Sequence, residues 1–93
     1  MADTDLARQI EELFLEAGGA HHQAYIETDG EDPEWPLWYA DFVHERLGQL
    51  LDAKFTKSEL VYLIVTAAKE QALKAPGAGW ARYYAKFFLQ RYG

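Results

Sequence analysis

Thr56-Lys57-Ser58-Glu59, followed by Leu60-Val61-Tyr62-Leu63-Ile64-Val65-Thr66-Ala67-Ala68, is the stretch that decides the fold of this 93-residue chain. Its first four residues form a capping box, in which a threonine hydroxyl and a glutamate carboxylate satisfy free N–H groups at a helix start. The apolar residues that follow cover more than half of a helical circumference, as in a helix buried on several sides. The sequence therefore predicts a central helix from Thr56 to Lys74.

Apolar residues at helical spacing predict further helices on both sides of this stretch. One runs from about Asp5 to Ala17 and should stop at Gly18-Gly19, because glycine is favoured at helix ends. A short helix is expected over 20–28, a longer one over 37–52, and a last one over 80–92. No segment alternates with period two, so strands are not expected. We predict an all-α fold, a single domain over residues 1–93 with four or five helices.

Composition excludes several classes of protein. Without cysteine there are no disulfides, no thiolate catalysis and no cysteine-based metal sites. The net charge of −6 argues against non-specific nucleic-acid binding. The first five residues lack the features of a secretory signal, and the most apolar stretch, 60–68, is shorter than the ~20 residues that span a bilayer. We therefore expect a cytoplasmic protein with neither a nucleic-acid nor a membrane partner.

Charge is distributed unequally along the chain. Residues 1–53 carry two arginines against thirteen Asp and Glu, a charge of −11, whereas residues 54–93 carry seven Lys and Arg against two Glu, a charge of +5. Oppositely charged helices could neutralise each other within one chain, through individually weak surface pairs. Alternatively, the asymmetry orients a protein partner or a second copy of the chain.

The aromatic cluster Trp35-Pro36-Leu37-Trp38-Tyr39 is the most distinctive feature of the sequence. Within the 37–52 helix, Leu37 belongs to the apolar half, whereas Trp38 and Phe42 lie on the opposite side among carboxylates. Either another segment covers these two rings, or they form a contact surface. Tryptophan and tyrosine dominate binding hot spots, so we assign Trp35, Trp38 and Phe42 as candidate partner-binding residues.

Carboxylates gather in the irregular segment before this helix, at Glu27, Asp29, Glu31, Asp32 and Glu34. Clustered oxygens are the ligands that hard cations prefer, although the spacing does not fit an EF-hand. Histidines could contribute if the fold brought them close, and the candidate ligands outside the segment are His21, His22 and His44. A divalent-cation site is therefore one alternative, and a solvated acidic loop is the other. No other cofactor is expected.

Motifs of known enzymes are absent, including a nucleophile elbow, a phosphate-binding loop and H-E-x-x-H. The spacing Asp41-x-x-His44 resembles a carboxylate–histidine pair of helical metal sites, but no second such pair exists. A small acid/base enzyme around His44 is a weaker alternative, which would need a deep pocket there.

The stretch from His21 to Ala40, and within it D-G-x-D-P-x-W-P-L-W-Y-A, resembles a motif of small uncharacterised bacterial proteins. The resemblance covers about a fifth of the chain and implies no activity or ligand. The leading hypothesis is a non-catalytic protein-interaction module, self-associating or with another protein as its partner. It would present the tryptophan-rich, acidic loop.

Overall fold

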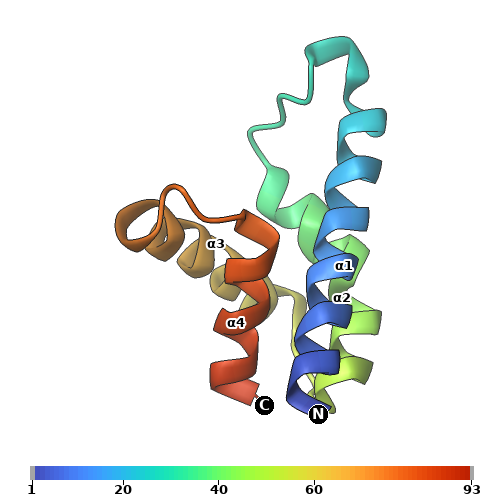
Figure 1. The fold of residues 1–93 in the computed structure, drawn as a ribbon. Helices are drawn as coiled ribbons and strands as arrows, with labels where there is room; N and C mark the ends of the chain where they lie inside the picture. Colours follow the sequence, from blue (N-terminus) through green and yellow to red (C-terminus); the bar gives the residue numbers. More distant parts are fainter. Residues whose placement is uncertain (1, 93) are drawn as a thin grey trace.

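The computed structural model describes the backbone of residues 2–92 and the side chains of residues 5–92, and it confirms the all-α prediction (Figure 1). The elements are α1 (Ala2–Ala24), the 3-10 helix η1 (Ile26–Thr28), α2 (Trp35–Leu51), α3 (Lys57–Lys74) and α4 (Trp80–Tyr92). α1 and α2 run alongside each other in opposite directions, and the segment that joins them lies at the end of the molecule away from both termini. No helix in residues 2–92 is long and apolar enough to cross a membrane.

One hydrophobic core is shared by the four α-helices. Its largest fully buried side chains are Phe14, Phe88, Ile10, Leu47, Leu60, Ile64 and Val43. Phe14 of α1 is at the junction with α4, where its ring packs against Trp80, Tyr84 and Phe88. Aromatic contacts of this kind add about 0.5–1.5 kcal/mol each beyond area burial, so they hold α1 firmly against α4.

α1 continues without interruption through Gly18-Gly19, so the predicted break between two helices is wrong. A Cβ atom at Gly18 would lie 3.0 Å from Cζ2 of Trp80. The glycine is therefore needed because the indole ring of α4 lies directly against the backbone of α1. Only residues 26–28 of the expected short helix form a separate element.

The capping box at the start of α3 is confirmed. The Thr56 hydroxyl accepts a hydrogen bond from the Glu59 N–H at 3.1 Å, and the Glu59 carboxylate accepts one from the Thr56 N–H at 2.8 Å. Hydrogen bonding of the Glu59 carboxylate to the Thr56 N–H, and then to the Thr56 side chain, holds the pKa of Glu59 below its ordinary value. The helix ends at Lys74, as predicted.

α3 does not occupy the central position that its apolar residues predict. Each α-helix packs mainly against two others, in the cyclic order α1, α2, α3, α4, so none is surrounded. α3 buries one face, with Leu60 and Ile64, against α2 and α4. Its outer face leaves Tyr62 69% and Leu73 84% exposed.

Two ion pairs join the acidic and basic halves of the chain. Lys57 pairs with Asp41 between α3 and α2, and Arg82 lies 3.7 Å from Glu11 between α4 and α1. Part of the charge asymmetry is thus neutralised within the chain. The carboxylates of the α1–α2 segment make no ion pair with a Lys or Arg among residues 5–92.

Candidate functional site

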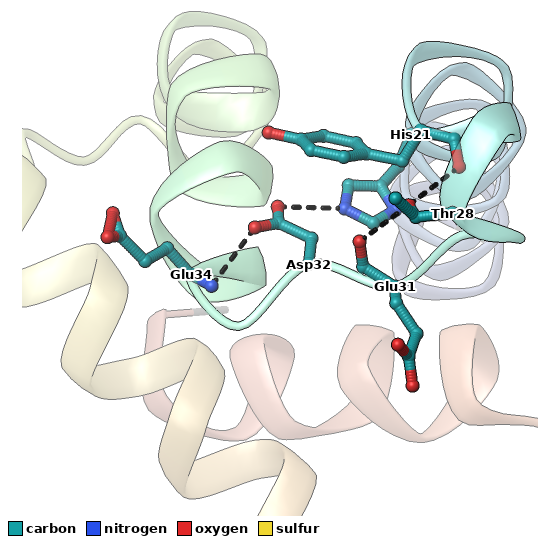
Figure 2. A network of polar contacts seen from close by, with 6 residues as sticks. His21, Thr28, Glu31, Asp32 and Glu34 are labelled. Atoms are coloured by element: carbon teal, nitrogen blue, oxygen red, sulfur yellow. Dashed lines mark hydrogen bonds and ion pairs between the residues drawn. The ribbon is translucent and has the colours of Figure 1, made fainter.

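A histidine and an aspartate are paired in a nearly water-free position at the end of α1 (Figure 2). Nε2 of His21 lies 3.0 Å from Oδ2 of Asp32, and the two side chains are only 8% and 7% exposed. The other carboxylate oxygen of Asp32 accepts a hydrogen bond from the Glu34 N–H at 3.0 Å. Burying such polar groups is favourable only when they are hydrogen-bonded, so each residue requires the other.

The turn after α1 places Asp32 over His21. Asp29 (φ 58°) and Gly30 (φ 86°) adopt the left-handed conformation that reverses the chain, and the Gly30 N–H donates to the Tyr25 carbonyl at 2.8 Å. Glycine adopts this conformation without the strain of a side chain, and a Cβ at Gly30 would lie 3.3 Å from Nδ1 of the exposed His22. The Thr28 hydroxyl lies 3.0 Å from the Tyr25 carbonyl and 2.9 Å from the Glu31 carbonyl, and it can donate to either.

Three aromatic rings enclose the imidazole of His21. Tyr25 stacks on it with a centroid separation of 4.8 Å, Trp38 meets it edge-on at 5.0 Å, and Tyr39 is tilted at 5.2 Å. Burial and then the negative charge of Asp32 raise the pKa of Tyr25. The His21–Asp32 pair is therefore the polar centre of an aromatic cluster at the junction of α1 and α2.

An aromatic pocket of about 370 Å³ opens beside the pair. It is lined by His21, Gly30, Asp32, Trp35, Tyr39, Trp80 and Tyr84. Burial raises the pKa of Tyr39, and burial together with the neighbouring Tyr39 raises the pKa of Tyr84 to about 12. Both phenols therefore stay protonated at neutral pH. The ionisable groups of the lining besides these phenols are His21 and Asp32, which pair with each other.

Trp38 and Phe42 form a stacked pair on the other side of α2. Their rings are 5.5 Å apart and inclined by 13°. Trp38 is half-buried against His21, so another segment covers part of it, whereas Phe42 is 36% exposed. Leu37 is 45% exposed, contrary to its predicted place on the core face. Leu37, Trp38, Asp41 and Phe42 together constitute what we call the acidic aromatic surface.

Of the three candidate partner-binding residues, the structure brings two together. Trp38 and Phe42 share the acidic aromatic surface, whereas Trp35 meets the ring of Tyr39 at 5.8 Å and lines the aromatic pocket. Tyr39, Trp80 and Tyr84, which also line the pocket, lie on the faces of α2 and α4 that pack against the core. Their helical spacing gives no sign that one edge of the core stays open.

The candidate metal ligands are dispersed. Among the side chains of residues 5–92, no three His, Asp or Glu are placed to hold one ion. Asp32 is turned toward His21, while the side chains of Asp29, Glu31, Glu34 and His22 are exposed. His44 lies on the third turn of α2 and hydrogen-bonds at 2.7 Å to the carbonyl of Phe55, which follows the end of α2 that is away from the acidic segment.

The proposed acid/base pair of Asp41 and His44 is not formed either. Asp41 pairs with Lys57, and Nε2–H of His44 donates to the Phe55 carbonyl, which can only accept. This bond joins α2 to the segment that leads into α3. His44 also lines an open hollow of about 630 Å³ together with Gln49 and Asp52.

No protein-family model matches this chain, and neither the curated proteins nor the solved structures include a significant match. Function must therefore be inferred from the chain's own side chains. They define a four-helix domain with two features that the core does not require, the aromatic pocket and the acidic aromatic surface.

Proposed function

We propose that this chain is a non-catalytic interaction module that associates with further copies of itself. The observation that carries the proposal is the stacked Trp38–Phe42 pair, whose apolar area is partly exposed beside carboxylates. Hot spots of interfaces are enriched in such aromatic residues. Exposed aromatic area of this kind is unfavourable in water, and a partner with apolar side chains would cover it.

The charges around the acidic aromatic surface favour a basic partner. The hollow on one side is lined by Tyr25, Asp32, Pro33, Glu34, Leu37, Trp38 and Asp41, which include three carboxylates and no Lys or Arg. The hollow on the other side is lined by Gln9, Glu12, Leu13, Glu16, Phe42 and Arg46. Complementary charge guides association and determines which surfaces meet.

A complementary surface exists on the same chain. On α3, Tyr62, Lys69 and Leu73 follow one another at intervals of seven and four residues, so they share one face of the helix. Tyr62 and Leu73 are among the most exposed large apolar residues of the described chain, and Lys69 between them is also exposed. This α3 outer face is apolar and basic, and it lies in the half of the chain that carries a charge of +5.

Association between the acidic aromatic surface of one copy and the α3 outer face of another is heterologous, because two different surfaces meet. Such contacts close into rings or extend into open chains. The proposal is therefore testable by complementation, since a copy defective in one surface retains the other.

The experiment is sedimentation velocity over a concentration series, with circular dichroism as the check on folding. Phe42→Ser disrupts the acidic aromatic surface, and Leu73→Ser disrupts the α3 outer face. If Phe42→Ser loses helicity, Leu37→Ser takes its place as the variant of the acidic aromatic surface. Leu15→Ser is the matched control, because Leu15 is 51% exposed and belongs to neither surface.

We expect the wild type and the control to associate, each surface variant alone to be monomeric, and an equimolar mixture of the two variants to form a one-to-one dimer. Added salt should weaken the association because the surface charges are screened. A wild type that stays monomeric throughout, or surface variants that associate as the wild type does, would refute self-association.

A further inference from the structure

The aromatic pocket has walls that the self-association described above does not use. Four rings from α2 and α4 meet in sequence, with centroid separations of 5.8 Å for Trp35–Tyr39, 5.9 Å for Tyr39–Trp80 and 5.2 Å for Trp80–Tyr84. Their planes are inclined by 88°, 84° and 76°. Successive rings are thus nearly perpendicular, so that the lining combines ring faces and ring edges around one space.

The lining also contains a carboxylate that no Lys or Arg neutralises. Within residues 5–92 Asp32 is hydrogen-bonded to His21 and to the Glu34 N–H, and it also interacts with the Tyr25 hydroxyl. Its side chain is 7% exposed, so water screens its charge poorly. A carboxylate can accept about four hydrogen bonds, which leaves capacity for a ligand.

We propose that the aromatic pocket binds an organic cation, a methylated ammonium or a guanidinium group. Aromatic faces attract a cation through their quadrupoles, most strongly for tryptophan, and the attraction grows when the site excludes water. Alkylated cations are weakly hydrated and lose little on entering such a site, whereas their methyl groups fill apolar space. A pocket of about 370 Å³ falls within the size range of small-ligand sites.

The charge of Asp32 distinguishes this ligand from a neutral one. A neutral aromatic or aliphatic molecule would gain from the rings but would make no charge interaction with the Asp32 carboxylate, whose ionisable partner is His21. An anion would be repelled by the carboxylate, and the pocket lining offers no Lys or Arg against it. A cation is the one class of ligand that both parts of the lining favour.

Two sources can supply this chemistry, a free small molecule or a methylated lysine or arginine side chain of another protein. The probes are choline for the first source, and N-acetyl-trimethyllysine methylamide for the second. The neutral isostere of choline, 3,3-dimethyl-1-butanol, has the same shape without the charge. Titrations are followed by NMR through the amide signals and the three tryptophan indole N–H signals.

Asp32→Asn and Glu34→Gln form a matched pair, because both remove one negative charge but Glu34 does not line the pocket. Trp35→Leu removes one wall at a half-buried position and keeps the proposal testable if Asp32→Asn unfolds. The dispersion of the NMR spectrum reports whether each variant is folded.

We expect choline to shift the indole signals of Trp35 and Trp80 saturably, with the neutral isostere about tenfold weaker or undetectable. Asp32→Asn and Trp35→Leu should each weaken choline binding about fivefold or more, and Glu34→Gln less than twofold. Tighter binding of the trimethyllysine probe than of choline would show that the cation belongs to a protein partner. Tighter binding of choline would show that the cation is a free small molecule. Absence of saturable shifts with both cations, or equal affinity for the neutral isostere, would overturn the proposal.

Discussion

Gly18 and Gly19 are neighbours inside α1 with opposite surroundings, and replacing each with alanine tests how closely α4 approaches α1. Alanine is favoured over glycine in a helix interior by about 0.8–1.0 kcal/mol. Nothing lies within 4 Å of a Cβ at Gly19. We therefore expect Gly19→Ala to raise the free energy of unfolding by nearly that amount.

At Gly18 the same gain is opposed by a close contact. The new Cβ would lie 3.0 Å from Cζ2 of Trp80 and 3.5 Å from the Tyr39 hydroxyl oxygen. The indole ring packs against Phe14, Tyr39 and Tyr84, so it cannot move away freely. Overpacking costs about 1–3 kcal/mol. After the gain in helix propensity is subtracted, Gly18→Ala should change the free energy of unfolding by between nearly zero and a loss of about 2 kcal/mol.

Urea denaturation of both variants measures the difference, which we expect to be about 1–3 kcal/mol in favour of Gly19→Ala. For a domain of this size, thermal melting should separate the two variants by about 4–8 °C per kcal/mol. Because Trp80 lines the aromatic pocket, Gly18→Ala should also weaken choline binding. Equal stabilisation by both alanines would show that the ring of Trp80 does not lie against the α1 backbone.

Three further predictions concern hydrogen bonds and one buried phenol. Asp32→Asn should lower the free energy of unfolding by about 1–3 kcal/mol, because it impairs the buried bond to His21; urea denaturation with Glu34→Gln as control measures this. Thr56→Ala removes the acceptor of the α3 cap and should cost about 1 kcal/mol in the same assay, a loss that Thr56→Ser should largely avoid. Tyr84 has its pKa raised to about 12 in the folded chain against about 10 unfolded. Its contribution to stability is therefore complete below pH ~10 and is lost between pH ~10 and ~12, as the unfolded chain releases its proton first. Tyr84→Phe should flatten that part of the stability profile, and an unchanged profile would contradict the assignment.

Local signals in the sequence were sufficient for most helix positions. The capping box gave the start of α3, and the last helix was placed at its observed limits, 80–92. These two predictions are confirmed because a helix cap and the spacing of apolar residues depend only on neighbours within one or two helical turns. The error at Gly18-Gly19 has a different origin, since the same glycines that end many helices also permit close packing. Whether the glycines end the helix or permit close packing depends on the position of Trp80, which is distant in sequence.

The candidate site was less predictable because it depends on contacts between distant residues. His21 and Asp32 are eleven residues apart, and their pairing needs the left-handed turn at Asp29 and Gly30. The sequence assigned both residues to a possible cation site, whereas in the structure they pair with each other. It recognised Trp38 and Phe42 as lying off the core face, but their exposure also depends on how α1 covers them. Leu37 is exposed even though it lies on the apolar half of the helical wheel, because it belongs to the first turn of α2, where the bundle offers little cover.

The Trp35–Tyr39 run, compact in the sequence, divides in space into two features. Residues four apart share a helix face, so Trp35 and Tyr39 line the aromatic pocket, whereas Trp38 pairs with Phe42 on the acidic aromatic surface. The His21–Asp32 pair touches both, because His21 contacts the rings of Trp38 and Tyr39 while Asp32 lines the pocket and the neighbouring hollow. Loss of this single hydrogen bond should therefore disturb cation binding and self-association together. Substitutions at Phe42 or Trp35 should each affect only one of the two.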